Sequence, residues 1–116
     1  MPREIYLLTP VPVVIEALLA AAAEVDDQLG VRALYDGAAL QLVGDDGDAV
    51  LTVQGSRLLQ DSADVARVTR GLEVPAGQVW WAEATAPWGP SGLTGVVIAR
   101  GLAAVLRGAV RVEDGT

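Results

Sequence analysis

Apolar and polar positions along the chain predict two copies of a strand followed by a helix. The first strand is predicted over Glu4–Thr9, an apolar run that Pro10 and Pro12 follow. Because proline is well tolerated in the first turn of a helix, the first helix is expected to begin near Pro12 and to continue towards Asp26. The C-terminal part repeats this order, with a strand at Gln78–Ala86, a helix at Gly92–Arg107 and a short strand at Val110–Val112.

The middle of the chain carries strand signals divided by turns that contain Gly and Asp. The candidate strands are Val31–Tyr35, Ala39–Val43 and Ala49–Gln54, and Arg57–Gln60 is expected to extend the last of them past a bulge at Gly55. A short helix is predicted over Ala63–Arg70, with Asp61 or Ser62 as its N-cap.

Two β–α–β units with right-handed crossovers place both helices on one face of a single sheet. The chain is therefore expected to form one α+β domain over residues 1–116, a ferredoxin-like sandwich with a mainly antiparallel sheet, an extra hairpin and a short additional helix. Glu16 and Glu24 on the first helix are expected to pair with Arg100 and Arg107 on the second at the solvent edge.

Composition excludes several chemistries. Of the 116 residues, 52% are hydrophobic, which is incompatible with intrinsic disorder. The chain has no Cys, His or Lys, so disulfides, thiolate or imidazole metal sites and His-assisted nucleophilic catalysis are excluded within it. Asp45, Asp46 and Asp48 around Gly47 lack the Glu spacing of a calcium loop and are interpreted as a hairpin turn. No metal and no cofactor are expected.

The formal net charge of −7 disfavours nucleic acid and favours a basic protein as partner. The longest apolar stretches fall short of the ~20 residues that a membrane-spanning helix needs, so no membrane association is expected. No secretion signal is recognisable, which predicts a cytoplasmic location, and the abundance of Ala, Val, Gly and Arg suggests a bacterial source.

Three of the five aromatic residues, Trp80, Trp81 and Trp88, fall close together. Adjacent residues of a strand point to opposite faces of a sheet, so Trp80 and Trp81 are expected on different faces. Either both are core residues, or one of them forms the centre of a partner or dimer interface with Trp88 at its rim.

The loop before the second helix contains Gly89, Ser91, Gly92, Thr94 and Gly95. In one interpretation, its backbone N–H groups approach an anion at the start of the helix. In the other, the loop only caps the helix, and Ser91 is the N-cap residue. The segment does not match a phosphate-binding or dinucleotide-binding fingerprint.

No catalytic residue is assigned, and three residues are candidates. Glu83 is acidic within an apolar strand; if it points inward it could serve as a general acid or base, and otherwise it lies on the exposed face or pairs with an Arg. The Met1-Pro2 start, the opening β–α unit, the layout of two such units and the length resemble the tautomerase superfamily. That resemblance implies removal of Met1, Pro2 as the catalytic base and an Arg nearby, for which Arg32 is the candidate.

The apolar surface predicted for two helices with narrow polar stripes exceeds what one sheet–helix interface can bury. The sequence therefore predicts a small acidic interaction module without enzymatic activity, most simply a homodimer. An immunity- or adaptor-type role would fit its charge. The alternatives are a small tautomerase-like enzyme and a domain that binds a small ligand or anion at Gly89–Gly95.

Overall fold

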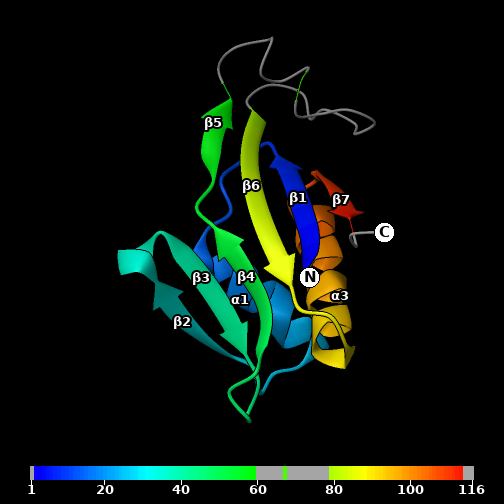
Figure 1. The fold of residues 1–116 in the computed structure, drawn as a ribbon. Helices are drawn as coiled ribbons and strands as arrows, with labels where there is room; N and C mark the ends of the chain where they lie inside the picture. Colours follow the sequence, from blue (N-terminus) through cyan, green and yellow to red (C-terminus); the bar gives the residue numbers. More distant parts are fainter. Residues whose placement is uncertain (1, 60–66, 68–78, 114–116) are drawn as a thin grey trace.

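The computed structural model describes residues 2–59, 67 and 79–113. Within them, an antiparallel sheet of seven strands is accompanied by two α-helices and a short 3₁₀ turn (Figure 1). The elements are β1 (Arg3–Thr9), α1 (Ile15–Val25), β2 (Gly30–Leu34), η1 (Tyr35–Gly37), β3 (Ala39–Val43), β4 (Ala49–Gln54), β5 (Arg57–Leu59), β6 (Val79–Ala86), α3 (Pro90–Val105) and β7 (Ala109–Glu113).

The strands follow the order β2-β3-β4-β6-β1-β7, and β5 also pairs with β6. β1 and β6 form the centre of the sheet and pair along their length, from Arg3 opposite Ala86 to Thr9 opposite Trp80. Each of these two strands is followed by a helix that returns across the same face. Because β1 and β6 are antiparallel, α1 and α3 also run in opposite directions, side by side behind the sheet as it is seen in Figure 1.

The main core lies between these helices and the sheet. Its fully buried side chains include Ile5 and Leu7 from β1, Leu51 from β4, Leu18 from α1, and Ile98 and Leu102 from α3. Two glycines let α3 approach its neighbours closely: a Cβ on Gly95 would lie 2.1 Å from the carbonyl oxygen of Val50, and one on Gly92 would overlap the carbonyl oxygen of Pro87. α3 therefore packs directly on the backbone of β4.

Most predicted elements are confirmed, with end positions shifted by a few residues. The α+β class, the antiparallel sheet and the hairpin between β3 and β4 are present. In the hairpin turn, Gly47 N–H donates to the Gly44 carbonyl and Asp48 N–H donates to Asp46 Oδ1. The helix predicted over Ala63–Arg70 and its caps Asp61 and Ser62 lie outside the described residues, apart from Arg67.

Two helix starts differ from the prediction. α1 begins at Ile15 rather than near Pro12, because Val14 is extended, and the N–H of Val13 before it donates to Ser56 Oγ at 2.9 Å. The N-cap of α3 is Gly89, not Ser91. Gly89 has a φ of +100°, a conformation that glycine adopts without steric cost, and Pro90 then occupies the first helical position.

The predicted pairing between charged stripes of the two helices is not formed. Glu16, Glu24, Arg100 and Arg107 are all exposed, and none of the four makes an ion pair with another described residue. Within the described part of the chain, these four charges are therefore not neutralised by a direct partner.

Candidate functional site

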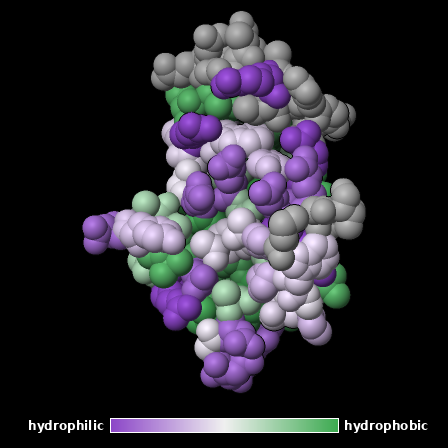
Figure 2. Space-filling view, viewed as in Figure 1, coloured by the Kyte–Doolittle hydropathy of each residue, from purple (hydrophilic) through white to green (hydrophobic). Residues whose placement is uncertain are grey.

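The middle of the sheet face opposite the helices is polar. Alternation along each strand puts its non-core residues here: Arg32 on β2, Gln41 on β3, Thr52 and Gln54 on β4, Glu83 and Thr85 on β6, Glu4 and Tyr6 on β1, and Arg111 and Glu113 on β7. Figure 2 views the molecule from this side and shows hydrophilic side chains gathered over the middle of the sheet. We call this surface the open face.

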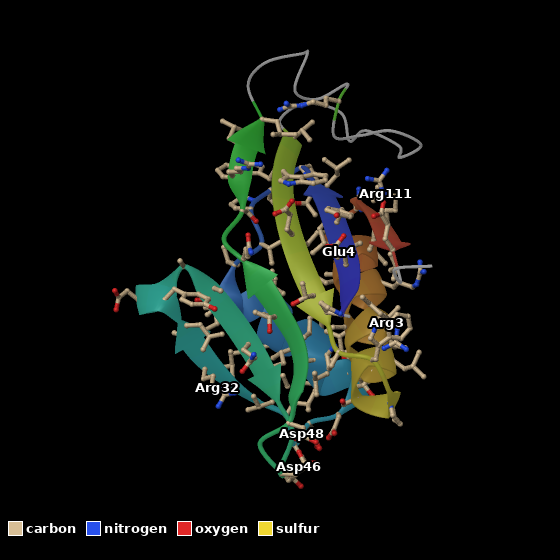
Figure 3. The ribbon with its side chains drawn as sticks, in the orientation of Figure 1. Arg3, Glu4, Arg32, Asp46, Asp48 and Arg111 are labelled. Atoms are coloured by element: carbon tan, nitrogen blue, oxygen red, sulfur yellow. The ribbon has the colours of Figure 1, made fainter. Side chains whose placement is uncertain are left out.

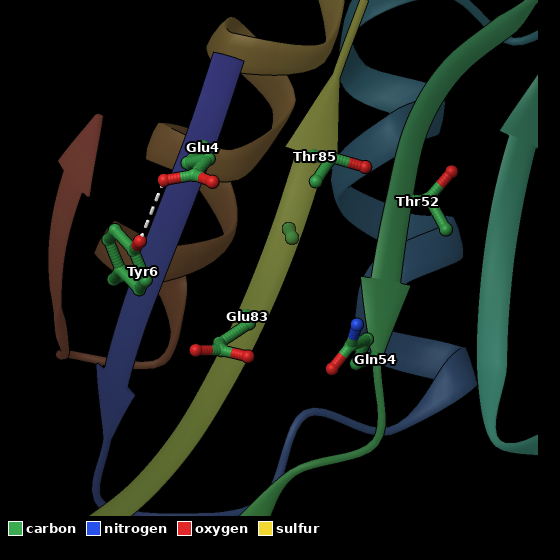
Figure 4. A pocket seen from close by; sticks show the side chains of 7 residues that line it. Glu4, Tyr6, Thr52, Gln54, Glu83 and Thr85 are labelled. Atoms are coloured by element: carbon green, nitrogen blue, oxygen red, sulfur yellow. Dashed lines mark hydrogen bonds between the residues drawn. The ribbon is translucent and has the colours of Figure 1, made fainter. Parts of the chain in front are cut away.

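A hollow of about 180 Å³ lies at the centre of the open face (Figure 4). Strand register positions its walls, because Glu4 lies opposite Thr85 and Tyr6 lies opposite Glu83. Thr52 and Gln54 of β4 form the remaining side. The hollow therefore joins two carboxylates, a phenol, two hydroxyls and an amide drawn from three adjacent strands.

Tyr6 is the most constrained of these groups. Its hydroxyl donates a hydrogen bond of 3.0 Å to Glu4 Oε2, its ring stacks on Trp81 with centroids 5.2 Å apart, and the Arg111 guanidinium lies 5.2 Å from the ring centroid. Burial raises the pKa of Tyr6 from 10.0 to about 12, helped by the hydrogen bond to Glu4 and by the negative charges of nearby glutamates. The neutral phenol is thus the form that the folded chain favours.

This shift predicts a loss of stability in strong alkali. Tyr6 holds its proton more tightly in the folded chain than in the unfolded chain, so its contribution is complete below pH 10 and is lost as the pH rises through about 12. Urea unfolding between pH 9 and 12 should show this decline, and the chain has no Lys or Cys to titrate in that range. Tyr6→Phe should decline less steeply, and an equal decline in both proteins would contradict the shift.

The hollow is suited to a cation or a hydrogen-bond donor. Glu4 and Glu83 supply negative charge, and none of the described residues that line it is basic. Glu83 is exposed and lines the hollow, so it does not point into the core. Over the described residues, no group of three or more acidic side chains is arranged to hold a metal ion.

Pro2 and Arg32 are not brought together. Pro2 is exposed just before β1. Arg32, labelled in Figure 3, lies on the edge strand β2, and the strand order puts β3, β4 and β6 between β2 and β1. The Arg32 guanidinium donates instead to Gln41 Oε1 at 2.7 Å. Neither residue lines the hollow, so a base and a helper arginine are not assembled around one pocket.

The three tryptophans lie in different environments. Trp81 is 5% exposed and packs on the open-face side with Leu8 and Tyr6, while Trp80 is half-buried on the opposite side of β6. Both indole N–H groups are buried, and neither has a hydrogen-bond partner among the described residues. Trp88 is 45% exposed, and the Arg3 guanidinium lies over its ring at 4.7 Å. The expected placement on opposite faces is confirmed, but the large aromatic surface of Trp81 is already buried within the chain.

Gly92 and Gly95 of α3 have a packing role. Gly92 and Gly95 face backbone atoms and leave no space for a ligand. Ser91 and Thr94 line a hollow at the start of α3 together with Asp26, Asp45, Asp46 and Asp48. Four carboxylates repel an anion, so the surroundings of this helix start disfavour the anion alternative.

The outward surface of the two helices carries several exposed apolar side chains. Leu93, Val97 and Val105 of α3 are 56%, 55% and 74% exposed, and Ile15 and Leu19 of α1 are each 38% exposed. Between them lie exposed small residues: Ala20, Ala23, Gly101 and Ala104. We call these nine residues the helix surface. In the sequence, this surface is indicated by the four-residue spacing of Leu93, Val97, Gly101 and Val105, which places them on one side of a helix. The interface predicted from the sequence was instead centred on the tryptophans.

Comparison of the chain with protein-family models, with curated proteins and with solved structures gives no match. Neither helix in the described part of the chain is long and apolar enough to cross a membrane.

Proposed function

We propose that this protein is a non-enzymatic interaction module that forms a homodimer through its helix surface. The observation that carries the proposal is the apolar row on α1 and α3, which is exposed although each helix already buries its other side in the core. Complete burial of a Leu or Val side chain contributes about 1.5–3 kcal/mol, so several half-exposed side chains provide a substantial drive to associate. This surface replaces Trp80 and Trp81 as the proposed centre of the interface.

The strand order supports a more specific fold proposal. The order β4-β6-β1-β7, with α1 and α3 on one face, is the arrangement of a ferredoxin-like sandwich, to which β2 and β3 add a hairpin at one edge. In this proposal the hairpin extends the open face, and the helices carry the contact between copies. A bacterial source remains part of the proposal on compositional grounds, and a cytoplasmic location remains part of it as an expectation from the sequence.

The enzyme and ligand-binding alternatives have less support. Pro2 and Arg32 lie apart, and Glu83 is exposed on a third strand. No two of these three candidates therefore face one substrate pocket. The acidic surroundings of Ser91 and Thr94 disfavour an anion at that loop.

Replacing Val97 with glutamate tests the proposed homodimer. Light scattering behind size exclusion, over a hundredfold dilution, should give the wild-type protein twice the 12.0 kDa mass of one chain. Val97→Glu should give the mass of one chain, because an unpaired carboxylate would be buried at the contact, and its dissociation constant should rise at least about 100-fold. Val97 is exposed and glutamate is a good helix former, so the fold of one chain should be retained.

Tyr35→Glu is the matched control. Tyr35 is 80% exposed in η1, away from the helix surface, so this variant should remain a dimer. A wild-type protein that is monomeric throughout would overturn the homodimer and would point to another protein, such as a basic one, as the partner.

A further inference from the structure

The charged residues around the helix surface are unequally divided between the two helices. α1 presents Glu16 and Glu24, and α3 with the residue two positions after it presents Arg100 and Arg107. None of the four forms an ion pair with another described residue. Because α1 and α3 are antiparallel neighbours, the first turn of α1 with Glu16 lies beside the C-terminal half of α3 with its arginines.

A second copy can face this surface with two-fold symmetry in two simple ways. In the first, the symmetry axis lies in the plane of the contact and is perpendicular to the helices. α1 then lies on α1 of the other copy, and glutamates face glutamates. With the axis parallel to the helices and between them, α1 of each copy lies on α3 of the other. Like charges facing each other across a contact oppose association, whereas opposite charges favour and orient it. Charge complementarity therefore selects the second arrangement.

We propose that two copies of the chain pair face to face with α1 of one on α3 of the other, so that Glu16 of each copy meets Arg100 of its neighbour. This inference rests on the proposed homodimer and specifies how its two copies are oriented. The two-fold symmetry forms each Glu16–Arg100 contact twice, and Arg107 extends the positive charge beside it.

The residues between the charges fit the same contact. Ala20 and Ala23 on α1 and Gly101 and Ala104 on α3 are small and exposed, and a Cβ on Gly101 would meet nothing within 4 Å. Small residues allow two helices to approach closely, and Leu93 and Val97 then provide the larger apolar side chains of the contact. Large apolar, small and charged positions thus all lie where α1 of one copy would cover α3 of the other.

Charge reversal at one position at a time tests this arrangement. Glu16→Arg and Arg100→Glu should each raise the dissociation constant of the homodimer at least about tenfold, because each places two pairs of like charges across the contact. A one-to-one mixture of these two variants should associate with nearly wild-type affinity. In that mixed dimer, the arginine introduced at position 16 of one copy faces the glutamate introduced at position 100 of the other. The second contact keeps its native Glu16 and Arg100.

Native mass spectrometry distinguishes the mixed dimer from either homodimer, and circular dichroism confirms that each variant is folded. Asp36→Arg and Arg32→Glu make the same changes in net charge away from the helix surface and should leave the dissociation constant unchanged. If Val97→Glu dissociates the dimer but the two reversals have no effect, or the mixture does not recover, the arrangement is wrong and the homodimer stands. If the wild-type protein is a monomer, both proposals fail.

Discussion

Gly95→Ala is expected to destabilise the protein by about 3 kcal/mol, because the added methyl group would overpack a contact that cannot relax. The added Cβ would lie 2.1 Å from the carbonyl oxygen of Val50 and 3.2 Å from the Cβ of Ala86. Val50 lies at the register shift of β4, and its neighbours Ala49 and Leu51 are paired with Val43 and Leu42 of β3, which limits how far its backbone can move. α3 would have to lift away from the sheet, which would expose part of the core around Ile98 and Leu102.

Gly101→Ala provides the matched control, because it makes the same substitution in the same helix. Nothing lies within 4 Å of a Cβ at this position, so only helix propensity changes, and a gain of about 0.5–1 kcal/mol is expected. Urea unfolding measures both variants in the Val97→Glu background, where the proposed association does not contribute. Equal effects of the two substitutions would show that α3 does not press on β4.

Trp81→Ala is expected to cost about 3–5 kcal/mol of folding stability, the range for removal of a large aromatic side chain from a core. The indole is 5% exposed, stacks on Tyr6 and packs with Leu8 and Val79. Its removal would leave a cavity under the open face and would take away the support that holds the Tyr6 ring beside the hollow. Urea unfolding, again in the Val97→Glu background, measures the loss.

Trp88→Ala is the control for this second variant. Trp88 is 45% exposed, and its main described contact is with the Arg3 guanidinium, an interaction of about 0.5–1 kcal/mol at an exposed site. The loss should therefore not exceed about 1 kcal/mol. If Trp81→Ala instead left folding intact and dissociated the wild-type dimer, Trp81 would be an interface residue and the proposed contact through the helices would be wrong.

Local patterns were sufficient to predict most elements. The runs at Ala39–Val43 and Ala49–Gln54 match β3 and β4 to the residue, because the turn between them is encoded by adjacent Gly and Asp residues. Helix starts were less predictable. Pro12 lies outside α1 because Val14 is extended, and the Val13 N–H before it is bound by Ser56, 43 residues away in sequence. Such a partner is not visible in the local sequence.

The residues that line the candidate site were even harder to predict from the sequence, because they come together through pairing of strands that are distant in the chain. Glu4, Thr52 and Glu83 are far apart in the chain, and they line one hollow only because β1, β6 and β4 are neighbours in the sheet. The sequence allowed Pro2 and Arg32 to lie in one site, but the same strand order separates them. Strand order is decided by how whole faces pack, which periodicity within one strand does not report.

The sequence by itself determined the α+β class, the elements, the acidic charge and the absence of Cys, His and Lys, because these follow from composition and from short-range periodicity. It also determined that Trp80 and Trp81 lie on opposite faces, since alternation is a property of any strand. Only the tertiary structure decided that Trp81 is buried and that the exposed apolar surface lies on the helices. The burial of a side chain depends on which other elements cover it, and those elements come from distant parts of the chain.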